Sequence, residues 1–516
     1  MMFQVGKLKA RSPKRAAIID LGSNTARVIL INFRPAYTYH LEDEIREVVR
    51  LREAMTRNGL AQDAMARGLS TLRLFKQYCD AMAADIIIPT TTSAVREAAN
   101  GRKFVRRVRK ETGLKLQVLS GEREAYYGTL GVLNCTPLQD GVVVDIGGGS
   151  VQVSQVNSRR FERGEALTLG ALALTERFVR SDPPKRREIR EIKREIERQI
   201  GSLRWLSHLS GPLVGLGGTI RNLARIEASR QAFPLNRING FVLTRSSVKK
   251  TTGLLEEFPV RERKEIPGLS KDRADIILAG ALVVESVMES LDVKELTVSQ
   301  YGLREGLFFE HFWKRLRYPV ASDPGEFSVL NMARFYDYQE RHAHHVGRLA
   351  LRLFDQMAPL HAYGDWERRL LHTAALLHDI GTVISYNDHH KHSQMLIAGN
   401  GIPGYSPRET ALIALLARYH RDGNPSLGDY RSLLPSEDEL RVARLAALLR
   451  LSECLERGKN SRVRDVVVKW NEGQLVLTLV AETTPVVEIW DAERLAVDLM
   501  EKTYKRSIVF KTRIGT

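Results

Sequence analysis

Val142-Val-Val-Asp-Ile-Gly-Gly-Gly-Ser150 is the most informative stretch of this sequence. Apolar β-formers lead into an acidic residue, so a buried strand would carry Asp145 to its end, where a carboxylate can bind a divalent cation. The three glycines have no Cβ, which lets a turn of the backbone approach phosphate oxygens. Residues 151–156 then alternate between apolar and polar, which predicts a returning strand. The pattern is a strand–turn–strand phosphate loop, unlike motifs in which a helix follows the glycines.

Two further glycine turns support this interpretation. In Ala17-Ile-Ile-Asp-Leu-Gly-Ser-Asn-Thr25, Asp20 ends an apolar strand, and a second strand follows at residues 28–31. The third turn lies in Val214-Gly-Leu-Gly-Gly-Thr-Ile220. One such turn alone is commonly only a turn, but together they indicate two β-rich α/β halves that hold a phosphate chain between facing loops. This arrangement is typical of the acetate and sugar kinase, heat-shock and actin superfamily.

Length and composition limit the possible classes of protein. A chain of 516 residues is too long for one core and predicts three or four domains. With 43% hydrophobic and 27% charged residues, and no run of eighteen apolar residues, we expect a globular protein that does not enter a membrane. The basic N-terminus lacks the apolar region of a secretory signal, and Cys79, Cys135 and Cys454 have no paired spacing. These features predict buried thiols and a cytoplasmic protein.

The net charge of +17 suits a polyanionic partner, which could be nucleic acid, an anionic membrane or a polymer of phosphate. The basic clusters contain few aromatic residues, which makes nucleic acid the weaker candidate. An amphipathic helix at 185–204 has a basic face, which is either only solvated or a polyanion contact.

Other segments of the first 315 residues predict helices and strands around these loops. Apolar residues at helical spacing predict a helix over 63–83, and a strand follows at 85–89. The hydroxyls of residues 90–93 are then expected to cap a helix that carries Arg96, which is either solvated or a phosphate contact. Glu122 and Glu124 lie in the first turn of the next helix, either because acidic residues favour a helix N-terminus or because one of them faces the cleft and orients a water. A buried helix at 275–289, a strand at 295–299 and a closing helix from 302 complete this part.

The sequence changes near residues 318–326, where the β pattern stops and a helical block begins. Ten of the thirteen histidines fall between His342 and His420, which suggests a metal site. The candidates are His342, the pair His378 and Asp379, and then His389, His390, His392 and His420. From residue 462 the β signal returns, with a hairpin at 465–478 followed by a helix and a strand.

Five motifs in order resemble the exopolyphosphatase / guanosine pentaphosphate phosphohydrolase family. They are Ile19-Asp-Leu-Gly-Ser-Asn-Thr25, Leu119-Ser-Gly-Glu-Arg-Glu-Ala125, Val144-Asp-Ile-Gly-Gly-Gly-Ser150, Gly215-Leu-Gly-Gly-Thr219 and Tyr301-Gly-Leu-Arg-Glu-Gly306. The match covers residues 15–315, and the rest resembles the helical HD-type domain and the small C-terminal domain of the long members. The resemblance implies two actin-like domains (1–135 and 136–315), an all-α HD-type domain (316–460) and a small α+β domain (461–516).

The resemblance also implies an activity and its residues. The expected reaction is Mg²⁺- or Mn²⁺-dependent, processive hydrolysis of the terminal phosphate of inorganic polyphosphate by a cytoplasmic homodimer. Glu124 would orient or deprotonate the attacking water, and Asp145 would bind the metal. The phosphate chain would be lined by Asp20, Ser23, Asn24, Arg96, Gly147, Gly148, Gly149, Ser150, Gly218 and Thr219. Because Glu124 lies at a helix N-terminus, we expect a low pKa and only a modest proton acceptor.

The HD-type resemblance implies a second divalent metal. His342, His378 and Asp379 match the metal ligands of active HD phosphohydrolases, and Glu453 stands where that pattern has an aspartate. The longer glutamate can either keep or lose the metal.

Three other functions remain open at this level. The same site could hydrolyse the 5′ γ-phosphate of guanosine pentaphosphate (pppGpp). A sensor could hold nucleotide or another polyanion without catalysis, although such a protein has no need of a water-orienting carboxylate. A sugar kinase is disfavoured because no sugar-recognition motif is evident.

Overall fold

The computed structural model describes residues 12–206, 209 and 211–515, so the basic N-terminal segment lies outside the described residues. The chain divides into two compact units, one formed by Met1–Gln231 with Ile238–Gly325 and the other by Ala232–Arg237 with Glu326–Thr516. The four-domain division stays a prediction. The three cysteines are buried free thiols, as predicted. Among the described helices, none is long and apolar enough to cross a bilayer.

The first half of unit one is a five-stranded mixed sheet of order β3-β2-β1-β4-β5. Residues 16–19 of β1 are fully buried because both faces of the strand are covered, which explains their continuous apolar run. β1 pairs antiparallel with β2 and parallel with β4. The strands are β1 (Lys14–Leu21), β2 (Thr25–Arg34), β3 (Thr38–Val48), β4 (Ile86–Thr91) and β5 (Gln117–Val118).

The second half repeats this pattern in a six-stranded sheet of order β10-β11-β9-β6-β7-β8. β6 pairs antiparallel with β7 and parallel with β9, as β1 does with β2 and β4. The two β-rich α/β halves predicted from the glycine turns are therefore present. The strands are β6 (Gly141–Ile146), β7 (Val151–Asn157), β8 (Arg160–Leu167), β9 (Leu213–Gly217), β10 (Val242–Thr244) and β11 (Glu295–Val298).

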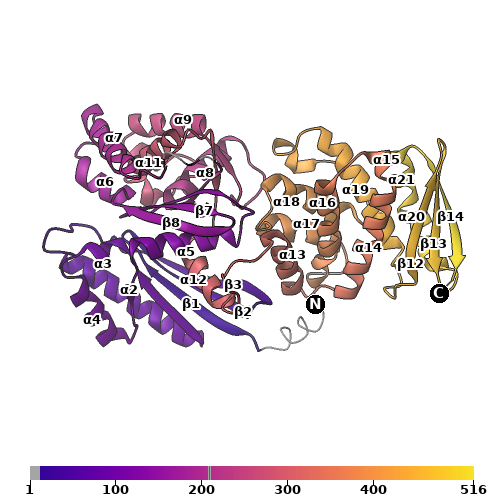
Figure 1. Cartoon of the computed structure of the whole chain (residues 1–516), viewed down its shortest axis with the longest axis horizontal. Helices are drawn as coiled ribbons and strands as arrows, with labels where there is room; N and C mark the ends of the chain where they lie inside the picture. The colour runs from indigo at the N-terminus through magenta and orange to yellow at the C-terminus, as the bar shows by residue number, and fades with distance from the viewer. Residues whose placement is uncertain (1–11, 207–208, 210, 516) are drawn as a thin grey trace. The chain divides into compact units, whose positions relative to one another are not determined.

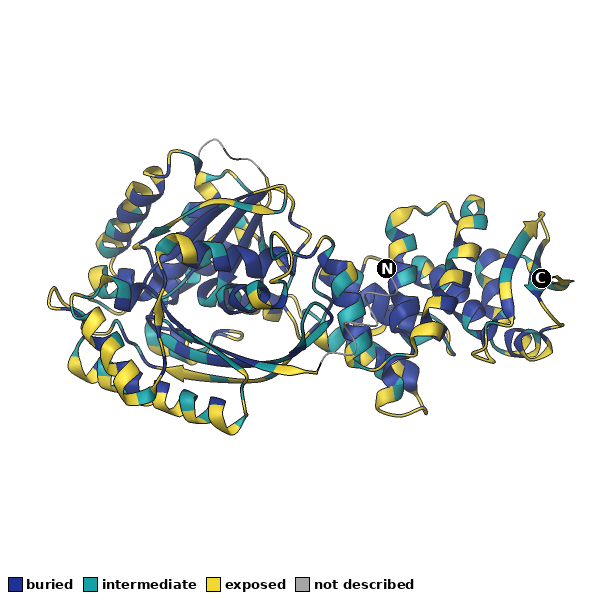
Figure 2. Ribbon diagram, turned by 60° about the horizontal axis from the view of Figure 1, so that its bottom comes forward, coloured by how far each residue is buried: buried dark blue, intermediate teal, exposed yellow. Residues whose placement is uncertain are grey.

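Helices cover both sheets of unit one (Figure 1). They are α2 (Gln62–Ala81), α3 (Ser93–Glu97), α4 (Gly101–Thr112), α5 (Gly121–Leu133), α6 (Ala171–Phe178), α7 (Arg186–Gly201), α8 (Gly218–Arg230), α9 (Arg245–Glu257), α10 (Val260–Arg263), η2 (Lys271–Arg273), α11 (Ile277–Ser290) and α12 (Leu303–Phe312). The outer helices expose one face (Figure 2), whereas the central strands β1, β2, β6 and β7 are largely buried and the strands β3 and β8 are more exposed.

The helices α5 and α12 cross between the two halves. α5 packs on β7 and β8 of the second sheet, and α12 packs on β1 and β2 of the first. Their close approach requires glycine, since a Cβ at Gly131 would lie 2.2 Å from the carbonyl oxygen of Gly302, and one at Gly306 would lie 1.9 Å from that of Tyr127. The crossing therefore links the halves that carry the glycine turns.

The expected hydroxyl cap before Arg96 is wrong. β4 continues to Thr91, so the Thr90 and Thr91 hydroxyls donate to the carbonyls of Ile19 and Leu21 in the neighbouring strand. Thr92 is the N-cap residue of α3 but makes no side-chain cap hydrogen bond. The Thr90 and Thr91 hydroxyls thus form hydrogen bonds within the sheet, whereas the sequence had predicted that they would cap the helix.

Unit two contains helices around one apolar core and a three-stranded sheet of order β12-β13-β14. The predicted hairpin is present, because β12 and β13 pair antiparallel. The elements are α13 (Pro324–Phe335), α14 (Glu340–Gln356), α15 (Ala358–His361), α16 (Asp365–Leu377), η3 (Ile380–Val383), α17 (His389–Asn400), α18 (Pro407–Tyr419), η4 (Gly428–Ser432), α19 (Glu437–Cys454), β12 (Val463–Trp470), β13 (Gln474–Ala481), α20 (Val486–Leu495), α21 (Val497–Tyr504) and β14 (Ser507–Ile514).

Candidate functional site

The glycine turns of the two halves face each other in unit one. A Cβ at Gly149 would lie 2.5 Å from the hydroxyl oxygen of Ser23 and 2.4 Å from that of Ser93. At Gly148 a Cβ would lie 3.1 Å from the Cβ of Asn24. Only residues without a side chain allow the two turns to meet this closely.

A cavity lies between the two turns, and most of the predicted site residues line it. These residues are Asp20, Ser23, Asn24, Glu124, Asp145, Gly147, Gly148, Gly149, Ser150 and Gly218. The predicted phosphate contacts Arg96 and Thr219 are not among the residues that line this cavity. Arg96 donates to the carboxylate of Glu124 at 2.8 Å and to the carbonyl of Leu119 at 2.9 Å. Thr219 is fully buried beneath Gly218.

Glu124 projects from the first turn of α5. The Ser120 side chain caps this helix by accepting from the backbone N–H of Arg123. Glu124 is 9% exposed, whereas Glu122 in the same turn faces solvent. The helix therefore directs only one of the two candidate carboxylates into the cavity.

The expected low pKa of Glu124 is wrong. Burial raises its pKa to about 7, and the negative charges of Asp145 and Asp20 add to this, although the hydrogen bond and charge of Arg96 oppose the rise. Loss of hydration in the cavity raises the pKa by more than the helix N-terminus lowers it, because a buried carboxylate keeps its proton more readily. A pKa near neutrality suits a proton acceptor.

Asp20 and Asp145 end the equivalent strands β1 and β6. Burial raises the pKa of both carboxyls to about 6, opposed for Asp20 by Arg304 and Arg27 and for Asp145 by Arg221. Each also raises the pKa of Glu124. Asp20 Oδ1 is buried and makes no hydrogen bond within the described part of the chain. This set of oxygen donors fits a hard divalent cation such as Mg²⁺.

Four arginines that the sequence interpretation did not name also line the cavity: Arg27, Arg221, Arg273 and Arg304. Arg304 lies inside the quoted Tyr301–Gly306 motif, and Arg27 and Arg221 closely follow glycine motifs, so their position was a usable signal. Arg273 comes from η2, and no motif marked it.

These arginines crowd positive charge into the cavity. Burial and the charges of Arg304 and Arg27 lower the pKa of Arg221 to about 9, and burial lowers that of Arg273 to about 10. Glu44 accepts from both Arg27 and Arg304 at 2.6 Å, and the carboxylates of Glu305 and Asp20 also act on Arg304. An anion with several oxygens would satisfy the remaining donors.

The histidine cluster predicted in the helical block also forms. His342 Nε2 lies 3.1 Å from Glu453 Oε2, and His378 Nε2 lies 3.0 Å from the same oxygen. Asp379 Oδ2 is 3.7 Å from His342 Nε2. Although burial alone would lower it, Asp379 and Glu453 raise the pKa of His378 to about 9. The glutamate therefore reaches the place where the resemblance expected an aspartate.

Comparison with known proteins identifies the family of this chain. The family model for the Ppx/GppA phosphatase family matches residues 38–314, and that for Ppx/GppA phosphatase, domain III matches residues 326–490. The crystal structure of the Aquifex aeolicus Ppx/GppA family member is 28% identical, covers 60% of this chain and all of its own, and has a TM-score of 0.51. An exopolyphosphatase from Cytophaga hutchinsonii is 26% identical, covers 58% of this chain and 98% of its own, and has a TM-score of 0.55. The chain has the actin-like fold of these proteins and belongs to the Ppx/GppA phosphatase family.

Proposed function

We propose that this phosphatase-family protein is an exopolyphosphatase that removes the terminal phosphate of inorganic polyphosphate processively, with Mg²⁺ (or Mn²⁺) as cofactor. The observation that carries the proposal is the cavity itself, where a buried carboxylate with a pKa near neutrality lies beside three further carboxylates, Asp20, Asp145 and Glu305, and four arginines. The likeness to a protein named an exopolyphosphatase supports the same substrate class.

In the proposed reaction, Arg27, Arg221, Arg273 and Arg304 bind the oxygens of the phosphate chain. Glu124 orients a water and accepts its proton as the water oxygen bonds to the terminal phosphorus and the bond to the bridging oxygen breaks. Asp145, with Asp20 beside it, would hold the Mg²⁺, which neutralises charge on the terminal phosphates when bound. Arg96 keeps the Glu124 carboxylate in position through its 2.8 Å hydrogen bond.

Phosphate release from long-chain polyphosphate, measured beside pppGpp at saturating Mg²⁺, tests this function. We expect the higher kcat/KM for polyphosphate. A higher value for pppGpp would assign the 5′-phosphohydrolase activity instead, and no release from either would leave a binding protein. Glu124→Gln should lower kcat by about 10²- to 10⁴-fold, the range for a lost proton acceptor. Glu122→Gln is the matched control, because this exposed glutamate should be replaceable without loss.

A metal titration separates the roles of the two carboxylates. Asp145→Asn removes an anionic ligand and should move the midpoint of Mg²⁺ activation to higher concentration. Glu124→Gln should lower the plateau and leave the midpoint in place. An unchanged midpoint for Asp145→Asn would remove Asp145 from the metal site.

We further propose that the protein acts in the cytoplasm as a homodimer, with neither a membrane nor nucleic acid as partner. Its three buried thiols suit a reducing compartment. Light scattering of the purified chain measures the oligomeric state.

A further inference from the structure

Arg273 differs from the other three arginines of the cavity in how its side chain is held. The other three each donate a hydrogen bond to an oxygen of the protein. The guanidinium of Arg273 makes no hydrogen bond or ion pair within the described part of the chain. It is buried against the turn after β9, because a Cβ at Gly218 would lie 2.1 Å from its central carbon. Arg273 therefore presents its donors to the occupant of the cavity.

The segment that carries Arg273 is a short helix with little support of its own. η2 contains three residues, and the backbone N–H of Arg273 donates to the carbonyl of Ser270 at 2.9 Å. The backbone N–H of Ser270 donates to the side chain of Asn222 in α8 at 2.8 Å. A single 3₁₀ turn has poor hydrogen-bond geometry, so its position depends on contacts with its neighbours.

Two ion pairs with the other half of unit one supply such contacts. Arg46, near the end of β3, pairs with Asp272, which directly precedes Arg273. Arg50, in the turn after β3, pairs with Asp275 through an Nη2 to Oδ2 distance of 2.9 Å. Both carboxylates belong to the second half and both guanidiniums to the first. Arg273 thus lies between two bridges that join the halves.

The turn that carries Arg50 is bonded to the opposite side of the cavity. The backbone N–H groups of Val49 and Arg50 donate to the carbonyl of Asn24 at 3.1 and 2.8 Å, and that of Arg52 donates to the carbonyl of Ser23 at 3.1 Å. Arg50 has a φ of 46°, a conformation that costs free energy for a residue other than glycine. The bridges therefore connect η2 to the turn in which Ser23 and Asn24 line the cavity.

Asp275 forms its bridge although a buried arginine of its own half is close enough to feel its charge. The negative charge of Asp275 raises the pKa of Arg263, against the lowering by burial. Even so, Arg263 Nε and Nη2 and Asp275 Oδ1 are buried without a hydrogen-bond partner among the described residues. Unsatisfied buried groups are costly, so the orientation of Asp275 towards Arg50 requires an explanation beyond the packing of its own half.

We propose that Arg46 and Arg50, through Asp272 and Asp275, form a clamp that positions Arg273 on a phosphate chain in the cavity. The four clamp residues do not line the cavity, so they act through Arg273 as positioning residues. A chain held by the turn of Ser23 and Asn24 on one side and by Arg273 on the other is bound by both halves. The inference rests on the phosphate-binding part of the proposed function and not on the hydrolytic step.

Binding of inorganic tripolyphosphate tests the clamp. Isothermal titration calorimetry at fixed Mg²⁺ uses the full chain with Glu124→Gln, which suppresses turnover. Asp272→Asn and Asp275→Asn each break one bridge, and each should raise Kd about 10-fold, the lower end for losing one charge-assisted hydrogen bond. Charge alone predicts the opposite sign, because removing a carboxylate beside the cavity favours a polyanion. An unchanged or lower Kd in both variants would overturn the clamp.

A matched control breaks an ion pair of the same strand that does not join the halves. Glu42 on β3 pairs with Arg15 on β1 at 2.8 Å, and both side chains are partly exposed like those of the clamp. Glu42→Gln should leave Kd within about twofold, as expected for a surface ion pair remote from the ligand. A 10-fold rise in this variant as well would show a general effect of the sheet and overturn the clamp.

A double-mutant cycle tests whether the clamp acts through Arg273. Arg273→Gln should itself raise Kd, and adding Asp272→Asn should then cause no further rise, because the group that the bridge positions is gone. Arg46→Gln combined with Asp272→Asn should likewise bind no more weakly than either single variant. Additive losses in both cycles would overturn the assignment.

Failure of the clamp and failure of the proposed hydrolysis give different results. Absence of phosphate release from polyphosphate, with tripolyphosphate binding weakened in the clamp variants, would refute the exopolyphosphatase and retain the clamp. An active exopolyphosphatase whose clamp variants bind normally would refute only the clamp. A Glu124→Gln protein that binds no tripolyphosphate would overturn both, since Arg273 would then have no phosphate chain to hold.

Discussion

At the scale of single residues, burial decides the chemistry of Glu124. The side chain lies in a helix turn that would ordinarily hold a carboxyl in its charged form. Within the cavity the loss of hydration is larger, and the nearby Asp145 and Asp20 add to it. A carboxyl at a helix N-terminus on a protein surface would have a low pKa, whereas burial raises the pKa of Glu124 to about 7.

The pH dependence of activity follows from this shift. In the proposed reaction Glu124 accepts a proton only as the carboxylate, so raising the pH through its pKa of about 7 should create the active form. We expect kcat/KM for polyphosphate to rise between about pH 6 and pH 8, since this parameter reports the free enzyme. The residual activity of Glu124→Gln should lack this rise. A profile that is flat in the wild type across this range would contradict the role of Glu124 as base.

Arg221 provides a second test at this scale, because sequence interpretation missed it. It lines the cavity from the first turn of α8, whereas Arg225 on the same helix faces solvent. Charge-assisted hydrogen bonds contribute about 1.5–3 kcal/mol, so Arg221→Gln should raise KM for polyphosphate roughly 10- to 100-fold. Arg225→Gln should leave KM within about twofold of the wild type, because an exposed charge outside the cavity contributes little. Equal effects of the two variants would remove Arg221 from the substrate site.

At the scale of secondary-structure elements, the crossing of α5 and α12 holds the site together. α5 carries Glu124 and α12 carries Arg304, and each helix packs on the sheet of the opposite half. The spacing of the helices depends on Gly131 and Gly306, whose missing side chains allow backbone contact.

Replacing one of these glycines should therefore lower both stability and activity. A methyl group at Gly306 would lie 1.9 Å from the carbonyl oxygen of Tyr127, so Gly306→Ala should cost about 1–3 kcal/mol of unfolding free energy. Gly253→Ala in α9 is the control, since nothing lies within 4 Å of the added carbon and alanine favours a helix by up to about 1 kcal/mol. Urea denaturation measures both. A Gly306→Ala protein as stable as the wild type would show that the crossing relaxes freely.

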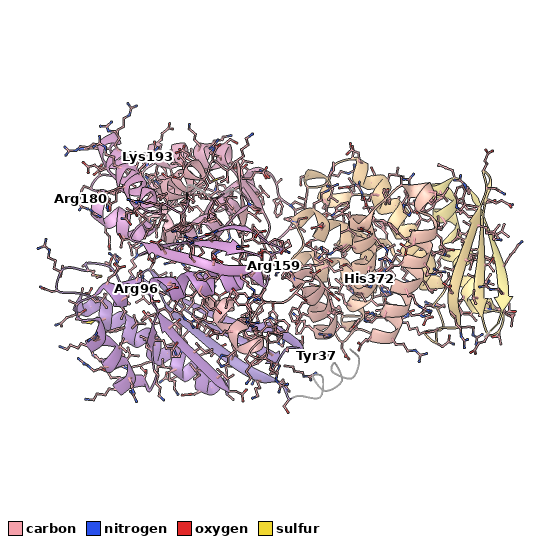
Figure 3. The ribbon with its side chains drawn as sticks, in the orientation of Figure 1. Tyr37, Arg96, Arg159, Arg180, Lys193 and His372 are labelled. Atoms are coloured by element: carbon pink, nitrogen blue, oxygen red, sulfur yellow. The ribbon has the colours of Figure 1, made fainter. Side chains whose placement is uncertain are left out.

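At the scale of the whole molecule, the chain carries a net charge of +17, which is more positive charge than is needed to neutralise a single small anion. Exposed arginines contribute to it on α7, where Arg190 and Arg194 project from a helix whose apolar stripe is buried. The label for Lys193 in Figure 3 marks this helix. A long polyphosphate could contact such residues while its end occupies the cavity.

Salt dependence tests this arrangement. Affinity for long polyphosphate should fall steeply with salt because many counterions are released, and affinity for pppGpp should fall less because it has fewer phosphates. Each lost contact should reduce the log–log slope for polyphosphate by about 0.7, so an Arg190→Gln/Arg194→Gln variant should show a smaller slope. Parallel slopes for the two substrates would count against a binding track outside the cavity.

Features that depend on neighbouring residues were predictable from the sequence. Three glycine turns after apolar strands, with Asp20 and Asp145 at the strand ends, indicate two similar halves because strand formation and glycine conformation are local properties. The contribution of His342, His378, Asp379 and Glu453 to one cluster was inferred from the family resemblance together with helical spacing.

Features that depend on convergence of distant segments were decided only by the tertiary structure. Four arginines from separate segments reach one cavity, Arg96 turns towards Glu124, and Thr219 lies beneath the surface. The pKa of Glu124 rises because packing removes water from it, which no local pattern encodes. Likewise, His389 and His420 contact Asp379 while the adjacent His390 faces Asp422. The residue types are set by the sequence, but their distances and hydration are properties of the packed chain.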